Sequence, residues 1–558
     1  MANISRAQIS RTAIERIYIA MRHLFIRGGY KPLGISGASM KKALLELQPE
    51  IYGSISDPEK VELNGLLYIF QRLPKGIEEC RYIKLISREG YEDSSFEAII
   101  PSKRRRNCYR IDEAQMFIEM TRGRSDIYDI LTHLTFMYIE AEKIRQNGLN
   151  SRDEPNRSWK IVESIVSSSS EEIDKGADLG LSHLSILLGR TYAETQALFQ
   201  LFEESEGVNN LFSIVYYLGK LSMDEFFKKE DREITFSSTL REQIGHHNFG
   251  ERWATKLKMH MYEAGWKNRP VHIISSNMHS VKNSLYGLGS KAKGKHDNLL
   301  TLVEDLSKSN NKSLNKKVDQ FAMNNGLIQI EDSYGTNIPV QLIDCEKLDS
   351  KFLPKELSNN ISRDIKPIIL VMDYAFGEQA YETMDELLKP LDLKDSKHYF
   401  NVESINIMGK AGILNGGKGD VMVPDSHVFE GTADNYHFSN DFDTTLLEEA
   451  QMNITYGPMI TVLGTSLQNK DVLRYFLKSS WKAAGLEMEG AHYQKAIQAA
   501  SKIRKSIRSN VVLRYAYYAS DNPLESGSTL ASGGLGLEGV KPTYLITLSI
   551  LKSILSSH

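Results

Sequence analysis

Cysteine is scarce in this chain: its 558 residues include three, Cys80, Cys108 and Cys345. They lie far apart in the sequence and form no Cys-x-x-Cys pair, and an odd number cannot all be paired within one chain. This excludes a full disulfide framework and is typical of reduced thiols in a cytosolic protein.

An excess of charge of either sign is also missing. Lys and Arg number 68 and Asp and Glu number 71, which gives a formal net charge of -3. A near-neutral chain has no global electrostatic attraction for nucleic acids or acidic membranes. We therefore expect no nucleic-acid partner.

Long uncharged apolar runs are absent from the sequence as well. The first residues carry charges throughout and lack an apolar signal core. No window approaches the about 18 uncharged apolar residues of a membrane span; the nearest, 544–555, contains Lys552 and has the spacing of a packed terminal helix. The sequence predicts a cytoplasmic protein without membrane association.

The first half of the chain has the periodicity of helices. A chain of this length needs two or three domains of about 100–200 residues. Ile14, Ile17, Met21 and Leu24 recur at helical spacing, and 116–144 and 179–204 repeat that pattern with little glycine or proline. Residues 1–265 are therefore predicted to form a mostly α-helical domain of unknown role, with a break at Pro155 and 167–170.

After Trp266 the sequence contains short apolar runs that alternate with helical patterns. This alternation predicts an α/β domain over 266–558, with a mixed, largely parallel sheet covered by helices on both faces. A stretch rich in Lys, Asn and Ser at about 288–365 predicts a polar insertion with some helix and a small hairpin around Gly335. The expected strands are 271–274, 367–372, 404–408, 420–423, 459–463 and 510–515, and the expected helices are 379–388, 470–483 and 491–507.

Small residues and isolated acids follow several of these strands. Ligands of open α/β sheets bind beyond the carboxyl ends of the strands, so the residues found there are candidates for a small-molecule site. Glycine at such a position lets a ligand approach the backbone. The candidates after strands are Gly409-Lys410-Ala411-Gly412, Gly464-Thr465-Ser466 and Ala519-Ser520-Asp521-Asn522-Pro523. Just before the expected helix 491–507 lies a further candidate, Gly485-Leu486-Glu487-Met488-Glu489-Gly490.

These segments resemble signatures of the nucleoside phosphorylase superfamily, in matching order over about 290 residues. Residues 486–491 (LEMEGA) resemble its "V-E-M-E-x-A" signature, and Ser520-Asp521 resembles its "S-D" after the last core strand. Residues 405–424 and 368–380 resemble its "G-x-A-G-G-L … G-D-V-V-V-P" segment and the glycine turn before it. Ser520–Leu524 (SDNPL) is most similar to the "S-D-K-P-L" of bacterial AMP nucleosidases, which also carry an extra amino-terminal domain.

The resemblance implies cleavage of the N-glycosidic bond of a purine nucleoside or nucleotide in a homo-oligomer, without a cofactor. Asp521 would be the general acid near purine N7, and Glu489 would accept hydrogen bonds from the ribose diol. Met488 would pack on the ribose, with Glu487, Ser466 and Ser520 beside the substrate. Gly409, Lys410, Ala411 and Gly412 would line it, and Lys410 could hold a phosphate.

Structural alternatives remain open at each of these positions. Asp521 in Asp-Asn-Pro is also a good helix cap or turn residue. Glu487 could be an exposed or salt-bridged acid, Met488 a core residue, and Lys410 a solvated lysine. The glycines at 409 and 412 would also suit an ordinary tight turn between a strand and a helix.

The loop after the first strand departs from the family pattern. Residues 275–280 (SSNMHS) lack the glutamate that activates water in methylthioadenosine-type nucleosidases and the Gly-Asp-Pro-x-x-Arg phosphate loop of hexameric phosphorylases. Ser276, Asn277 and His279 could orient a phosphate or a water, or could simply cap the next helix. Glu378 is a further candidate base. The sequence thus leaves open a hydrolase, a phosphorylase that uses inorganic phosphate, and a protein that only senses nucleotides.

Two other groups of residues carry weaker hypotheses. The basic run 103–106, with Arg110, Arg122 and Arg124, could be a regulatory phosphate site, but a solvated charge run is the favoured interpretation. His133 with Glu140 and Glu142 does not place three ligands on one helical face, and no His-Glu-x-x-His sequence is present, so no metal site is expected. The glycine-rich stretch 526–539 lacks the Lys-Ser/Thr ending of a P-loop and is predicted to be a loop.

Overall fold

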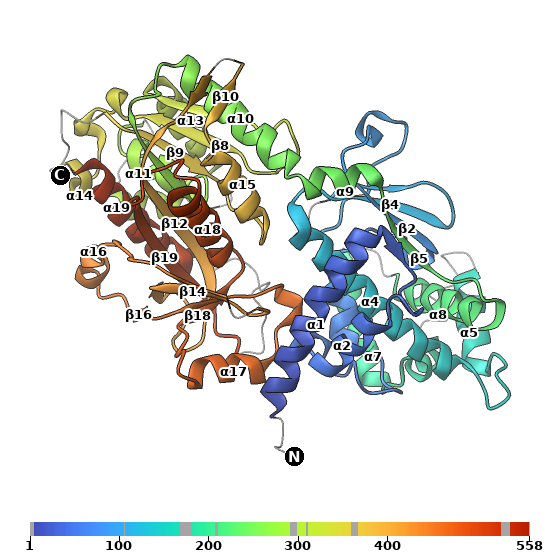
Figure 1. Cartoon of the computed structure of the whole chain (residues 1–558). Helices are drawn as coiled ribbons and strands as arrows, with labels where there is room; N and C mark the ends of the chain where they lie inside the picture. Colours follow the sequence, from blue (N-terminus) through green and yellow to red (C-terminus); the bar gives the residue numbers. More distant parts are fainter. Residues whose placement is uncertain are drawn as a thin grey trace. The chain divides into compact units, whose positions relative to one another are not determined.

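A computed structural model of the chain forms two compact units (Figure 1). The first comprises Met1–Thr121, Asp126–His246 and Ser466–Val472, and the second comprises Arg122–Ser125, His247–Thr465 and Leu473–His558. Within these ranges the structure describes residues 5–104, 106–167, 180–206, 210–290, 298–308, 311–358, 366–394, 396–432, 434–525 and 536–556.

Helices make up most of the first unit, but it also contains a five-stranded sheet that the sequence analysis missed. The strand order is β1-β5-β2-β4-β3. These strands have two to five residues and lie among helical patterns; β4 falls at the start of 116–144, which the periodicity assigned to a helix. The strands are β1 (Gly29–Tyr30), β2 (Tyr82–Ile86), β3 (Cys108–Arg110), β4 (Gln115–Glu119) and β5 (Glu233–Phe236). The helices include α1 (Arg6–Arg27), α2 (Ala38–Leu47), α3 (Leu63–Phe70), α4 (Gly123–Gly148, in this unit from Asp126), α5 (Arg157–Ser167), α7 (Tyr192–Glu206), α8 (Leu211–Lys228) and α9 (Ser238–Gly245).

The second unit is built on a mixed, twelve-stranded sheet. Its main path runs β15-β14-β17-β18-β12-β6-β9-β8-β7, and β19 and β13 join through β12. The central pairs β12–β6, β6–β9 and β12–β19 are parallel, as the sequence predicts. The strands are β6 (Pro270–Ser275), β7 (Leu327–Ile330), β8 (Val340–Asp344), β9 (Ile368–Met372), β12 (Asn401–Ile413), β13 (Val421–Val423), β14 (Ser426–Phe429), β15 (Asn435–His437), β16 (Ile454–Tyr456), β17 (Met459–Thr461), β18 (Gly485–Glu487) and β19 (Val512–Asp521).

All six predicted strands are present, whereas the segment 288–365 differs from its prediction. The expected hairpin around Gly335 forms from β7 and β8, but β8 pairs with β9 and so extends the main sheet. Helices α12 (Leu299–Leu306) and α13 (Lys312–Asn324) bury Leu302, Val303 and Val318 in the core. Lys312, Lys316 and Lys317 lie exposed on α13, whereas 291–297, 309–310 and 359–365 lie outside the described residues.

Helices cover both faces of this sheet, and its core has two layers. Alternate strand residues face opposite sides: Ile273 and Leu370 belong to one layer, Ile274 and Val371 to the other. The first layer is closed by α10 (Asn248–Glu263), α15 (Gln379–Leu387) and α18 (Gly490–Gln498), and the second by α11 (Ser280–Tyr286), α12, α13 and α19 (Val540–Leu555). Because Trp253, Leu257 and Met261 of α10 pack on the sheet, the second unit begins before the boundary at 265 that the sequence suggests.

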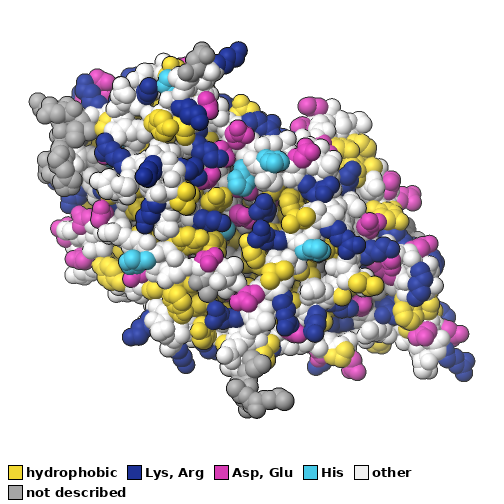
Figure 2. Space-filling model, in the orientation of Figure 1, with side chains coloured by type: hydrophobic (Ala, Val, Ile, Leu, Met, Phe, Trp, Pro, Cys, Tyr) yellow, Lys and Arg dark blue, Asp and Glu magenta, His cyan; other side chains and the backbone are white. Residues whose placement is uncertain are grey.

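Among the described residues, no helix is long and apolar enough to cross a membrane. On the face drawn in Figure 2, Lys and Arg side chains alternate with Asp and Glu side chains over the described surface. This mixture agrees with the near-neutral net charge of the sequence.

Candidate functional site

The segments with the family signatures meet at the carboxyl ends of the central strands. β12 and β19 run parallel, with Ala411 opposite Ala519 and, after a shift of register that skips Ser520, Gly412 opposite Asp521. At the same end of β12, Gly412 and Ile413 pair with Leu486 and Gly485 of β18. The pairing therefore brings 409–412, 485–490 and 519–521 together at one edge, although they are far apart in sequence.

Asp521 is a buried acid at this edge, with 1% of its surface exposed. Its Oδ1 accepts a hydrogen bond of 2.6 Å from Ser520 Oγ, which also lies 3.1 Å from the carbonyl oxygen of Ala411. Its Oδ2 is buried and has no hydrogen-bond partner in the described part of the chain. Burial raises the pKa of the Asp521 carboxyl above its usual range, opposed by Ser520, Lys410 and Lys418. Such a carboxyl retains a proton to higher pH than an exposed aspartate.

Glu487 holds the turn between β18 and α18. One of its oxygens accepts a hydrogen bond from Thr461 Oγ1, and the other accepts from the backbone N–H groups of Glu489, at 2.6 Å, and Gly490. Burial raises the pKa of this carboxyl to about 7, against the lowering effect of these donors. Both oxygens are engaged inside the protein, so this geometry favours positioning of the turn over contact with a ligand.

Glu489 is half-buried and reaches a second glycine turn. Its Oε1 accepts a 2.9 Å hydrogen bond from the backbone N–H of Gly377, just after β9. Gly377 has φ +54°, and an added Cβ would lie 2.4 Å from Ser125 Oγ and 3.8 Å from the terminal methyl of Met488. Both the conformation and the space therefore require glycine here. Met488 is 8% exposed beside this turn.

Ser125 and Arg124 fix the same turn from a distant part of the sequence. The backbone N–H of Glu378 donates a 2.8 Å hydrogen bond to Ser125 Oγ. Arg124 Nη1 lies 3.2 Å from Glu378 Oε1, so the candidate base Glu378 is held in an ion pair. These contacts could not be predicted from local sequence patterns, because about 250 residues separate the partners.

Replacing Ser125 with alanine is expected to lower the free energy of unfolding by about 0.5–1.5 kcal/mol, because the hydrogen bond to the turn at Glu378 is lost. If this loss acts through Glu489, the effects of Ser125→Ala and Glu489→Gln will not add in a double-mutant cycle. Urea unfolding of both single variants and the double variant measures the coupling. Ser439→Ala, at an exposed serine of the same unit, is the matched control. Fully additive losses would separate Ser125 from Glu489.

Gly409 has a packing role in the structure. A Cβ at this position would lie 2.7 Å from the ring of Tyr517 in the paired strand, so Tyr517 requires the glycine. Tyr517 OH in turn lies 3.0 Å from Nε2 of buried His427, whose ring stacks on Phe438. Lys410 is exposed next to Gly409, within electrostatic reach of Asp521.

Burial lowers the pKa of His427 to about 3, so this imidazole is neutral at neutral pH. An unfolded histidine titrates near 6.5, so the unfolded chain binds one more proton between these values. The stabilising contribution of His427 is therefore fully present above pH 6.5. As the pH falls from 6.5 toward 3, the free energy of unfolding decreases by about 1.4 kcal/mol per pH unit.

We expect His427→Phe, which keeps a ring on Phe438, to weaken the acid dependence of stability below pH 6.5. Urea unfolding at pH 7 and at pH 5 gives the free energy of unfolding at each pH, and the difference between them is compared between the wild type and the variant. His437→Phe, at an exposed histidine, is the control. An unchanged pH dependence in His427→Phe would mean that His427 titrates alike in both states.

The first-strand loop lies next to β9, but much of it serves the fold. The backbone N–H of Ser276 donates to the carbonyl of Met372 at 3.0 Å. Asn277 Oδ1 accepts a 2.8 Å hydrogen bond from the backbone N–H of Ser280 and so caps α11. Ser276 is buried, Asn277 is half-buried and His279 is exposed. Capping, one of the two alternatives for this loop, is therefore present for Asn277.

Two of the sequence-based candidates lie in the first unit. Ser466 is buried there and hydrogen-bonds with Tyr52. Arg106, in the basic run, is also buried and pairs with Asp126 at 2.7 Å and Asp129 at 2.8 Å. The interpretation of this run as solvated is therefore wrong for Arg106, because two acids one turn apart on α4 neutralise it. Arg105 and most of 526–539 lie outside the described residues.

His133 has a structural environment, as expected. Its Nδ1 lies 3.2 Å from Tyr52 OH and its Nε2 3.4 Å from Asp129. No cluster of His, Cys, Asp or Glu that could hold a metal ion occurs within the described ranges.

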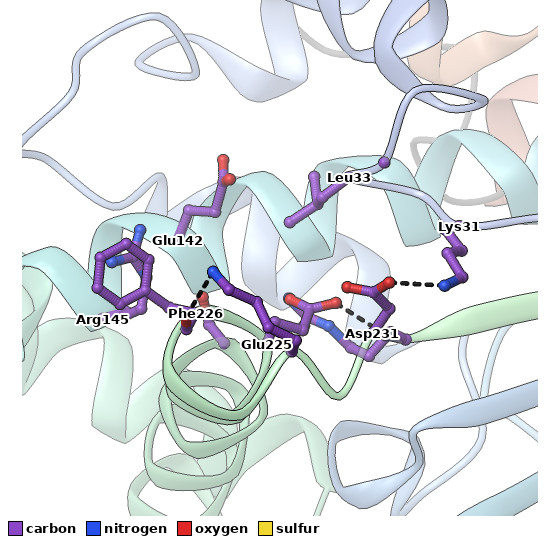
Figure 3. Close-up of a pocket in the computed structure, with 11 residues that line it drawn as sticks. Lys31, Leu33, Glu142, Arg145, Glu225, Phe226 and Asp231 are labelled. Atoms are coloured by element: carbon purple, nitrogen blue, oxygen red, sulfur yellow. Dashed lines mark hydrogen bonds and ion pairs between the residues drawn. The ribbon is translucent and has the colours of Figure 1, made fainter.

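The first unit has a hollow of about 200 Å³ (Figure 3). Its charged groups largely satisfy one another: Lys31 pairs with Asp231 at 2.7 Å, and Arg232 pairs with Glu225. Arg145 lies over the Phe226 ring, 4.3 Å from its centroid. This volume is below the about 300–1,000 Å³ of typical ligand pockets, and the paired charges leave little for a ligand to bind.

The second unit is thus an α/β fold in which several acidic residues lie at the carboxyl ends of the strands of a mixed sheet. The chain belongs to the family described as "Family of unknown function (DUF6909)", whose model matches residues 38–324 and 290–556. No curated protein matches the chain.

Several solved structures resemble half of the chain. A 5'-methylthioadenosine/S-adenosyl homocysteine nucleosidase from Helicobacter pylori has 13% identity and a TM-score of 0.31, with 51% of this chain and 99% of that chain covered. The futalosine hydrolase of the same organism has 13% identity and a TM-score of 0.31, covering 51% and 98%. Uridine phosphorylase from Schistosoma mansoni has 13% identity and a TM-score of 0.30, covering 50% and 85%. At TM-scores this low, the likeness does not establish a shared activity.

Proposed function

We propose that the second unit is an N-glycosidase that hydrolyses the bond between base and ribose in a purine nucleoside or nucleotide. The observation that carries this proposal is the buried carboxyl of Asp521, with one oxygen bound by Ser520 and the other without a partner in the described chain. Burial raises its pKa, so this carboxyl retains a proton to higher pH than an exposed aspartate, which favours the role of general acid. Donated to the departing purine, this proton lets the base leave neutral.

Glu489 is the proposed ribose-binding residue. One oxygen accepts from Gly377 N–H, which orients the carboxylate. The carboxylate can accept hydrogen bonds from a ribose diol, and its charge favours the cationic sugar that forms as the bond breaks. Met488, on the same turn, offers a soft apolar surface for the sugar face.

Water is the proposed nucleophile in preference to inorganic phosphate. Acidic side chains follow the strands at this edge: Asp373, Glu378, Glu489 and Asp521. Arg124, a nearby cation, is paired with Glu378. Because Asp521 carries a proton in the proposed reaction and Glu378 is paired with Arg124, the charges of Asp373 and Glu489 are the ones that would repel a phosphate dianion placed beside C1′, whereas neutral water would not be repelled.

A nucleotide such as AMP is the favoured substrate within this class. Lys410 is exposed beside the site and carries the positive charge that a 5′-phosphate would need. The similarity of residues 520–524 to AMP nucleosidases supports the same choice. The test compares kcat/KM for AMP with kcat/KM for adenosine, in the wild type and in Lys410→Ala. If the variant keeps the preference for AMP, Lys410 does not bind the 5′-phosphate.

The experiment that tests hydrolysis is adenine release from AMP and adenosine with and without inorganic phosphate. We expect equal rates in both conditions, with free ribose or ribose 5-phosphate as the second product. Absolute dependence on phosphate, with a sugar 1-phosphate as product, would instead identify a phosphorylase.

A further inference from the structure

Asp373 is an acid at the site that the sequence analysis did not single out. It is the first residue after β9, whose last residue, Met372, pairs with Ser275 at the end of β6. Because Ser276 N–H bonds to the carbonyl of Met372, Asp373 lies beside the first-strand loop. This is the loop that lacks the water-activating glutamate of the family it resembles.

Each of the other acids along this edge has a partner within the protein or, like Asp521, a role in the proposed reaction. Glu378 pairs with Arg124, Glu489 accepts from Gly377 N–H, and Glu487 accepts three hydrogen bonds within its own turn and from Thr461. Within the described part of the chain, the Asp373 carboxylate accepts one hydrogen bond, of 2.9 Å, from the backbone N–H of Tyr374. The side chain is half-buried, so a carboxylate oxygen is left to meet a small molecule.

Asp373 and Glu489 both lie near Tyr493, whose hydroxyl lies 2.9 Å from Ser275 Oγ. Burial raises the pKa of Tyr493, and the negative charges of Glu489 and Asp373 raise it further. The two carboxylates therefore lie within electrostatic reach of one point at the end of β6. Asp373 is thus close to the residue assigned to the ribose and on a different strand from the acid Asp521.

We propose that Asp373 is the general base that activates the hydrolytic water, an inference that rests on the proposed hydrolase function. In this step one water proton passes to the Asp373 carboxylate, and the water oxygen forms a bond to C1′ of the ribose. The bond from C1′ to the purine nitrogen breaks, and its electron pair leaves with the base. The base takes a proton from Asp521. Burial raises the pKa of Asp373 above its usual range, which makes it a stronger base than an exposed aspartate.

The test is Asp373→Asn, an isosteric change, in the full chain with AMP as substrate. We expect kcat to fall about 10²–10⁴-fold with KM changed little, and the slope of log(kcat/KM) against pH on the acid side to fall by about one. Asp392→Asn, at an exposed aspartate of the same unit, is the matched control and retains the wild-type rate. A folded Asp373→Asn with a near wild-type rate, or a slowed one with the acid limb unchanged, overturns the inference.

Folding of the variant is checked by circular dichroism. If Asp373→Asn does not fold, Asp373→Glu replaces it in the test. A loss of kcat above tenfold with KM unchanged supports the role of Asp373 as the base, and a wild-type kcat contradicts it. If the wild type and Asp373→Asn are both active, the role of Asp373 as the base is rejected and the hydrolase function stands. If the wild type cleaves no purine nucleoside or nucleotide, the proposed function itself is rejected.

Discussion

Asp521→Asn is expected to lower turnover about 10²–10⁴-fold while substrate affinity changes little, because general acid catalysis contributes to the transition state. Asparagine keeps the size of the side chain and can still accept the hydrogen bond from Ser520, but it has no proton of suitable acidity to donate. Single-turnover adenine release and equilibrium binding separate the two quantities. A rate equal to that of the wild type removes Asp521 from the chemistry.

The pH dependence gives a second readout for Asp521. A general acid must be protonated, so kcat/KM falls as pH rises through the pKa of Asp521 in the free enzyme. Burial raises that pKa, so the decline begins at higher pH than for an exposed aspartate. In Asp521→Asn this alkaline decline disappears from the residual activity. An alkaline limb that persists unchanged in the variant belongs to another group.

The second large effect is expected for Glu489→Gln with ribose substrates. Gln keeps the size of the side chain but loses the negative charge and part of its acceptor capacity. A charge-assisted hydrogen bond contributes about 1.5–3 kcal/mol, so kcat/KM is expected to fall from tenfold to several hundredfold. Glu449→Gln, at an exposed glutamate, is the control for the substitution itself.

The substrate provides the more selective test of Glu489. A 2′-deoxy substrate lacks one of the two hydroxyls, so the same substitution should cost it less activity than it costs the ribo substrate. A variant that merely folds poorly loses activity on both substrates equally. Equal losses for ribo and deoxyribo substrates would mean that Glu489 does not contact the diol.

The central strands of the second unit could be predicted because their apolar runs are local and separated by helical patterns. The rule that ligands of such sheets bind beyond the carboxyl ends of the strands found Asp521. It would also have found Asp373, which directly follows the expected strand 367–372. The short strands β1 to β5 gave no comparable signal.

Long-range contacts decide what the sequence could not predict. Gly409 is fixed by the ring of Tyr517, and the turn at Gly377 by Ser125, residues about 110 and 250 positions away. Likewise, Arg106 looked solvated because its partners Asp126 and Asp129 lie on another element. Local patterns contain no information about such partners, so the roles of these residues follow only from the three-dimensional arrangement.

The most direct test of the account is chromatographic identification of the products formed from a panel of purine nucleosides and nucleotides, without phosphate, by the wild type and by Asp521→Asn. The account predicts release of a free purine base by the wild type, with AMP among the substrates, and a loss of about 10²–10⁴-fold in the variant. No base release above background from any member of the panel, or equal release by both proteins, would contradict it.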